Sequence, residues 1–116
     1  MTTASRTAEE VFAHHGQSLG AESPDDIISD YSADALLIVQ SKVYRGREGA
    51  RQVFTQLLNE VPQAKWALNT VFADDVLYLE WQARSARSRI DDGIDTFVFK
   101  DGIIVIQTVR YTVTPG

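Results

Sequence analysis

The sequence predicts a single α+β domain in which helices and one strand come first and an antiparallel sheet follows. Apolar residues recur at helical spacing before Pro62, which predicts amphipathic helices there. After Pro62 the chain is rich in strand-forming residues, and the short turns Asp74–Asp75 and Asp101–Gly102 predict an antiparallel meander. Such segregation is typical of the α+β class, and 116 residues suffice for one core without disulfides. We expect one domain over residues 1–116, with residues 1–6 as a flexible tail.

The first helix is predicted by a capping box formed by Thr7 and Glu10, and Gly20 is expected to end it. Its apolar stripe consists of Ala8, Val11, Phe12, His15 and Leu19. These positions recur every three or four residues, so one side of this helix should face a core.

The later elements follow from local signals. Pro24, with a serine before it and two aspartates after it, predicts a short helix that runs to about Tyr31. Residues 35–39 form a strand by residue type, and a third helix begins near Gly49 and ends at Pro62. Further strands are expected over residues 66–73, 76–87, 92–99 and 103–113. The expected order is α-α-β-α-β-β-β-β.

Composition argues against several classes of protein. A formal net charge of −5 disfavours a nucleic-acid partner, and no apolar run approaches the ~20 residues of a membrane span. The N-terminal stretch lacks the apolar core of a signal peptide, and the absence of cysteine excludes disulfides and cysteine-ligated zinc. We expect a cytoplasmic protein. His14 and His15 lie about 100° apart around a helix and cannot chelate one metal ion together, so no metal site is expected.

Four segments carry a family pattern: residues 31–35, residues 44–46 leading to a helix that begins with Gly49, residues 94–102, and the last strand ending near Tyr111. Together they resemble the nuclear transport factor 2-like superfamily, which includes SnoaL-like polyketide cyclases and ketosteroid isomerases. The resemblance implies a cone-shaped, curved antiparallel sheet with a mixed edge, wrapped around three N-terminal helices. It also implies a pocket for a small apolar or planar ligand, a homodimer formed through the sheet, and no cofactor. Because this fold hosts unrelated functions, the resemblance is specific for the fold.

Asp95 is the strongest candidate for a site residue. It alternates with Phe97 and Phe99, so its carboxyl faces the pocket if those rings do. Burial raises the pKa of a carboxyl unless a cation or hydrogen bonds compensate. In ketosteroid isomerases the aspartate of the matching Ile-Asp-x-Phe segment is a protonated oxyanion donor. The alternative is that Asp95 only closes a structural ion pair or hydrogen bond.

His15 is the second candidate, because it lies on the apolar stripe of the first helix. The resemblance to ketosteroid isomerases places it where they have a tyrosine hydrogen-bond donor. A histidine could fill that role or act as an acid or base near neutral pH. The alternative is a histidine that is satisfied at a helix–sheet contact and takes no part in chemistry.

The strand over residues 76–87 allows two orientations, which differ by a one-residue slip. Plain alternation turns inward the apolar set Leu77, Leu79, Trp81 and Ala83. The resemblance instead turns toward the pocket the set Tyr78, Glu80 and Gln82. We favour the second orientation, because polar residues that break a pattern are expected at functional sites.

Two expectations depend on that orientation. The first is a dimer interface made of the apolar face with Leu77, Leu79 and Trp81 together with the face with Ile94, Thr96 and Val98. The second concerns Arg84: a hairpin turn near Arg89–Ile90 would place it opposite Asp95, and its charge would keep that carboxyl ionised.

The expected substrate-binding residues are Tyr31, Val39, Trp66, Tyr78, Gln82, Phe97, Gln107, Val109 and Tyr111. Together the aromatic members would make the pocket apolar. The family pattern also breaks. The proton-shuttling aspartate of the isomerases maps onto Val39, and the aspartate-arginine-aspartate set of limonene epoxide hydrolases maps onto Gln82, Glu80 and Val109. The resemblance therefore carries over neither chemistry.

The leading hypothesis is a pocket in which Asp95, His15, Glu80 and Arg84 form the catalytic group. The chemistry would be cofactor-free proton transfer on an apolar carbonyl compound, such as isomerisation, cyclisation or dehydration. The alternative, motivated by Val39, is a non-catalytic module for ligand binding or dimerisation. A protein-transport role rests on fold analogy alone.

Overall fold

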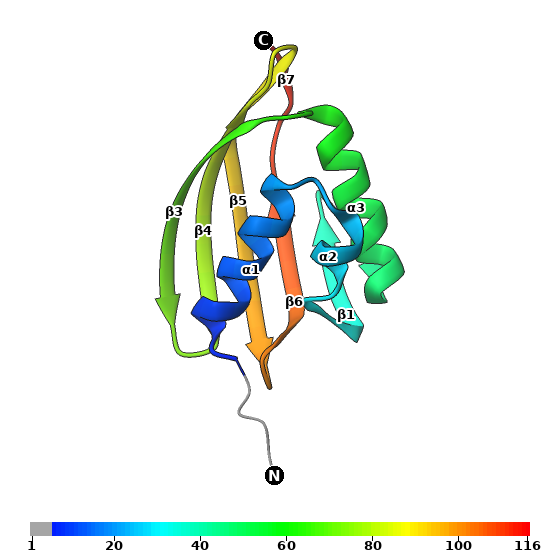
Figure 1. The fold of residues 1–116 in the computed structure, drawn as a ribbon, viewed down its shortest axis with the longest axis vertical. Coiled ribbons are helices and arrows are strands. Elements are labelled where there is room, and N and C mark those ends of the chain that lie inside the picture. The colour runs from blue at the N-terminus through cyan, green and yellow to red at the C-terminus, as the bar shows by residue number, and fades with distance from the viewer. Residues whose placement is uncertain (1–5) are drawn as a thin grey trace.

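The computed structural model describes residues 6–116, and within this range three helices lie against one side of a curved, unclosed sheet (Figure 1). The helices are α1 (Ala8–Gly20), α2 (Pro24–Ile28) and α3 (Gly46–Glu60). This arrangement confirms the predicted α+β class. No helix in the described part of the chain is long and apolar enough to span a membrane.

The strands are β1 (Tyr31–Val39), β2 (Lys42–Arg45), β3 (Lys65–Ala73), β4 (Val76–Arg84), β5 (Ser88–Lys100), β6 (Ile103–Arg110) and β7 (Thr114–Pro115). Their order across the sheet is β2-β1-β6-β5-β4-β3, and β7 pairs with β5. The pair β1–β6 is parallel, whereas every other pair is antiparallel. The sheet is therefore mixed. Its first strand in sequence, β1, pairs with β6, which lies near the end of the chain.

The capping box at the start of α1 is confirmed. The Thr7 side chain accepts a hydrogen bond from the backbone N–H of Glu10 at 3.1 Å, and the Glu10 carboxylate accepts one from the backbone N–H of Thr7 at 2.8 Å. These bonds satisfy two donors at the end of the helix. The helix then buries Val11, Phe12 and His15 against the sheet.

The segment after α2 differs from its expectation. α2 ends at Ile28, and Tyr31 already belongs to β1. The cause is Asp30, whose buried carboxylate accepts hydrogen bonds from His14 and Arg6 and whose backbone oxygen accepts one from Ile104 at 2.8 Å. These bonds hold Asp30 beside β6, so β1 begins at Tyr31, where the sequence predicted the end of the helix.

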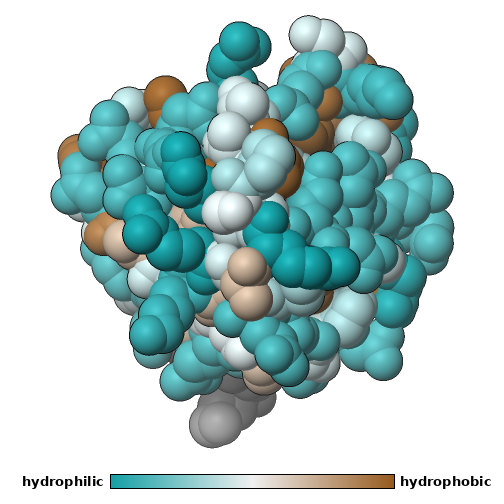
Figure 2. Space-filling model, turned by 90° about the horizontal axis from the view of Figure 1, so that it is seen from above, coloured by the Kyte–Doolittle hydropathy of each residue, from teal (hydrophilic) through white to brown (hydrophobic). Residues whose placement is uncertain are grey.

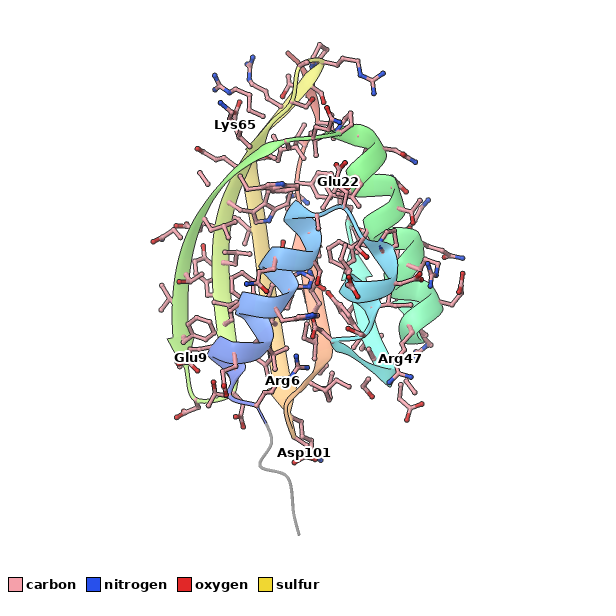
Figure 3. The ribbon with its side chains drawn as sticks, viewed as in Figure 1. Arg6, Glu9, Glu22, Arg47, Lys65 and Asp101 are labelled. Carbon is pink, nitrogen blue, oxygen red and sulfur yellow. The ribbon has the colours of Figure 1, made fainter. Side chains whose placement is uncertain are left out.

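The N-terminal tail was expected over residues 1–6, of which residues 1–5 lie outside the described range. Arg6 itself is held in place, because its guanidinium donates to Asp30 Oδ1 at 3.0 Å and to the Gly102 carbonyl at 3.1 Å. Figure 3 shows Arg6 beside the β5–β6 turn that carries Asp101.

One strand was not predicted, and several strand bounds differ from those expected. β2 was missed, because its two-residue turn uses Gln40 and Ser41 at φ 50° and 77° and contains no glycine to signal it. β4 ends at Arg84 and β5 begins at Ser88, so the hairpin turns earlier than Arg89–Ile90. Hydrogen bonds between Ser85 and Ser88 close this turn.

The core fills the space between α1, α3 and the concave face of the sheet, where Figure 3 shows side chains from both layers. Alternate residues of β4 and β5 enter this core. No helix within residues 6–116 covers the opposite face of the sheet, which carries exposed apolar side chains. They are Ile38, Val43, Val71, Val76, Tyr78, Ile94 and Ile106, and we call this surface the outer face.

Candidate functional site

A small cavity lies inside the cone between α1, α3 and the sheet. Its volume is about 30 Å³, which is room for roughly two water molecules. It is lined by His15, Leu19, Val53, Phe54, Leu57, Trp66, Leu68, Trp81, Asp95, Gln107, Val109 and Tyr111. We call it the inner cavity. Nearly all of this lining is apolar, so the few polar groups in it stand out.

Asp95 faces the inner cavity, as expected, and is 6% exposed. Its Oδ1 accepts a hydrogen bond from Trp81 Nε1 at 2.8 Å, and its Oδ2 accepts one from Gln107 Nε2 at 2.9 Å. Burial raises the pKa of Asp95 to about 7, although both hydrogen bonds favour the ionised form and act in the opposite direction. The carboxyl therefore exists in both forms near neutral pH.

The orientation of Gln107 is set by Tyr31. The Tyr31 hydroxyl donates to Gln107 Oε1, which turns the amide nitrogen toward Asp95. Burial raises the pKa of Tyr31 well above its usual value, so it stays a neutral donor. Tyr31 and Gln107 were expected near the pocket, and the structure joins them in one chain of hydrogen bonds that ends on Asp95.

His15 lies on the helical side of the inner cavity and is 3% exposed. Four aromatic rings surround its imidazole at centroid distances of 5.2 to 6.0 Å, those of Phe54, Phe97, Tyr31 and Phe12. Its Nδ1 is buried and has no hydrogen-bond partner among the described residues. Burial lowers the pKa of His15 to about 4, against a smaller opposing effect of Asp30. The imidazole is therefore neutral at pH 7, and its buried Nδ1 lies in a mostly apolar environment.

Trp81 was expected in a dimer interface, on the apolar face of its strand, and its polar role at the site was missed. Its indole lies so close to Gly93 on β5 that a Cβ there would come within 2.2 Å of the ring. Only glycine permits this contact, which lets Nε1 reach Asp95. A glycine within a strand marks close approach of another group, and Gly93 was the sequence signal that could have revealed the arrangement.

The orientation that we favoured for β4 is wrong. Tyr78, Glu80, Gln82 and Arg84 all point to the outer face and are exposed. Glu80 accepts hydrogen bonds from Asn69 at 3.2 Å and from Tyr78 at 3.0 Å, on the far side of the sheet from Asp95. The apolar alternation decides the register, because the opposite choice would leave Leu77 and Trp81 in water.

Arg84 does not pair with Asp95 either. The early hairpin turn places Arg84 opposite Arg89, and Asp95 lies opposite Leu79. An irregularity in the β4–β5 pairing between Trp81 and Ala83 shifts the register further. Amide and indole N–H groups therefore contact the carboxyl in place of the guanidinium that we expected.

The other expected lining residues lie within the core. Trp66, Val109 and Tyr111 line the inner cavity, Phe97 packs beside His15, and Val39 lines a neighbouring recess. Leu77, Leu79 and Trp81 are buried and cannot form a dimer interface, whereas Ile94, Thr96 and Val98 do belong to the outer face. Within residues 6–116, no three histidine, aspartate or glutamate side chains come together as a metal site.

Comparisons with known proteins agree with this architecture. A family model described as a SnoaL-like domain matches residues 12–107. A de novo designed protein with a curved β-sheet is similar in structure, with a TM-score of 0.78 and 16% identity over 90% of this chain and 84% of that one. No curated protein matches the sequence.

Two natural structures are similar as well. The epoxide hydrolase/cyclase-like enzyme SalBIII, which has a role in pyran ring formation in the polyether salinomycin, gives a TM-score of 0.77 and 15% identity over 94% of this chain and 95% of its own. A candidate ketosteroid isomerase from Kribbella flavida gives 0.74 and 11% identity over 90% and 77%. At these identities the likeness concerns the fold.

Proposed function

Because the chain belongs to the SnoaL-like family, within the nuclear transport factor 2-like superfamily, we propose that its inner cavity binds a small apolar carbonyl compound and catalyses a proton transfer on it without a cofactor. Isomerisation, cyclisation and dehydration are the reactions of this class. The observation that carries the proposal is that Asp95 and His15 line one apolar cavity, and that the buried Nδ1 of His15 has no hydrogen-bond partner among the described residues. Isomerase and cyclase-like enzymes among the similar structures support it.

The two groups suit complementary roles. Between pH 4 and 7 Asp95 is mainly a neutral acid and His15 mainly a neutral base, given pKa values of about 7 and about 4. The Asp95 O–H would donate to the carbonyl oxygen of the substrate, and His15 would accept a proton from the adjacent carbon and return it elsewhere. Trp81 and Gln107 already occupy one site on each Asp95 oxygen, so the acidic proton is left for the ligand.

The test is a screen of flat, apolar carbonyl compounds by thermal shift, followed by product analysis, on the wild type, Asp95→Asn and His15→Phe. Asp34→Asn, which changes an exposed carboxylate, is the control. We expect product from the wild type and the control and none from Asp95→Asn, with kcat/KM highest near pH 5.5 and lower below 4 and above 7. Turnover that is unchanged in Asp95→Asn would refute the assignment.

A second candidate function is a non-catalytic module that binds a ligand or forms dimers. Two points favour it: the inner cavity holds only about 30 Å³, and the resemblance to ketosteroid isomerases maps their proton-shuttling aspartate onto Val39. This function predicts that ligands stabilise the protein and are recovered chemically unaltered.

We also propose that the chain forms a homodimer through its outer face. No helix in the described part of the chain covers this face, and its exposed apolar residues extend across five neighbouring strands and the edge strand β2. Large apolar surfaces of this kind commonly mark interfaces.

We also propose a cytoplasmic location, which would suit a chain without cysteine.

A further inference from the structure

A second hollow adjoins the inner cavity on the side of β1 and β2. Its volume is about 120 Å³, and we call it the recess. It is lined by Val39, Gln40, Lys42, Tyr44, Val53, Gln56 and Tyr111. Val53 and Tyr111 also line the inner cavity, so these two side chains form the wall between the hollows.

The recess is rich in hydrogen-bond donors. Lys42 supplies an ammonium, Tyr44 a hydroxyl, and Gln40 and Gln56 supply amides, while no carboxylate is among the lining residues. The neighbouring carboxylate, Glu60, accepts hydrogen bonds from Tyr111 at 2.6 Å and from Gln56 at 3.5 Å. In a chain of net charge −5, a lysine among neutral donors favours an anionic group.

The β1–β2 turn forms the rim of the recess. Gln40 and Ser41 hold the positive φ angles that a two-residue hairpin turn requires, and the Gln40 backbone N–H donates to the Val109 carbonyl at 3.1 Å. These contacts fix the position of the rim. The turn sets the side chains of Gln40 and Lys42 over the recess.

We propose that the recess is the head-group subsite of a larger ligand chamber, and that the ligand is an elongated apolar carbonyl compound ending in a carboxylate. The carboxylate binds beside Lys42, and the apolar body passes Tyr111 into the inner cavity. The centroid of the Tyr111 ring lies 5.6 Å from that of Trp81, and its hydroxyl donates to Glu60. Because Tyr111 lines both hollows, the ligand would have to displace this ring. This inference rests on the proposed function, since the carbonyl would reach Asp95.

The experiment compares benzoylbutyric acid with its methyl ester by titration calorimetry. The proteins are the wild type, Lys42→Met, Asp95→Asn and the control Lys100→Met, which changes an exposed lysine at the far end of β5. We expect the wild type and the control to bind the acid about tenfold more tightly than the ester. Lys42→Met should lose this preference, and Asp95→Asn should weaken both compounds alike.

Equal affinity for acid and ester in the wild type, a preference that survives in Lys42→Met, or no binding of either compound would overturn the head-group subsite. A preference that depends on Lys42, with affinities unchanged in Asp95→Asn, would keep the recess as an anion site and refute the proposed role of Asp95. If Asp95→Asn weakens binding and Lys42→Met has no effect, the proposed role of Asp95 is supported and the head-group subsite is refuted.

Discussion

Asp95 and His15 respond to the same environment in opposite directions. Burial disfavours the charged form of each group, so it raises the pKa of the acid to about 7 and lowers the pKa of the imidazole to about 4. Between about pH 4.5 and 6, a surface carboxylate and a surface imidazole would both be mainly charged. Inside this core both are neutral, and the proposed roles of Asp95 as acid and His15 as base depend on this.

Replacing Asp95 by Asn should change how stability depends on pH. The folded-state pKa of Asp95 lies above its unfolded value, so its contribution to stability is full at low pH and is lost as pH rises toward 7. By pH 8 the loss is roughly 4 kcal/mol at most. Asp95→Asn should therefore gain stability relative to the wild type between pH 5 and 8, as measured by urea unfolding. A constant difference between the two proteins would contradict the raised pKa.

Replacing Gly93 by Ala should displace the Trp81 ring, because the new Cβ would lie 2.2 Å from it. The hydrogen bond to Asp95 would be lost, and overpacking should cost roughly 1–3 kcal/mol. Unfolding monitored by tryptophan fluorescence would measure both effects. Gly16→Ala is a matched control, since nothing lies within 4 Å of a Cβ there, and it should be neutral or stabilising. Equal effects of the two substitutions would contradict the close contact.

At the scale of elements, local signals predicted the helices well. The pair Thr7 and Glu10 and the proline at position 24 mark helix starts through backbone hydrogen bonds that involve only neighbouring residues. β2 and the parallel β1–β6 pair were not predictable in this way, because no glycine marks the first and only tertiary structure decides the second.

The candidate site was also predictable only in part. Asp95 was predicted from alternation with Phe97, and the structure places it in the inner cavity. Its partners Trp81 and Gln107 come from two other strands, so their contacts depend on a register that the sequence left open. A functional argument favoured the wrong register for β4, whereas the simpler hydrophobic alternation was correct.

The capping box gives a prediction at this scale. Thr7→Ala removes the side-chain oxygen that accepts the Glu10 N–H, and it should cost about 1 kcal/mol of stability. Thr55→Ala, at an exposed position within α3, is the control and should have little effect. Thermal unfolding would compare the two, and a Thr7→Ala variant as stable as the control would exclude a role for the cap.

At the scale of the whole molecule, the architecture has to be distinguished from the surfaces and cavities that could carry a function. A designed protein shares this curved sheet, so the architecture alone does not specify chemistry. Seen from above, the molecule is mostly hydrophilic with small separate hydrophobic areas, and no wide apolar opening is visible (Figure 2).

The outer face gives the prediction at this scale. The double substitution Ile94→Lys and Ile106→Lys places two charges at its centre and should convert the proposed dimer to a monomer, because buried unpaired charges oppose association. Val113→Lys, at an exposed residue beyond β6, is the control and should leave the dimer intact. Sedimentation velocity at micromolar concentration would distinguish them. A monomeric wild type would refute the dimer.

The parallel β1–β6 pair has a consequence for the order of folding. Leu37 lies opposite Gln107, and Tyr31 contacts Gln107 across 76 positions of the chain. During synthesis β1 is made early but has no central neighbour until β6 leaves the ribosome. Contacts of such long sequence separation form slowly. The hydrogen-bond chain that ends on Asp95 is therefore among the last parts of the molecule to form, and a nascent chain stopped before residue 103 would contain Asp95 without its site.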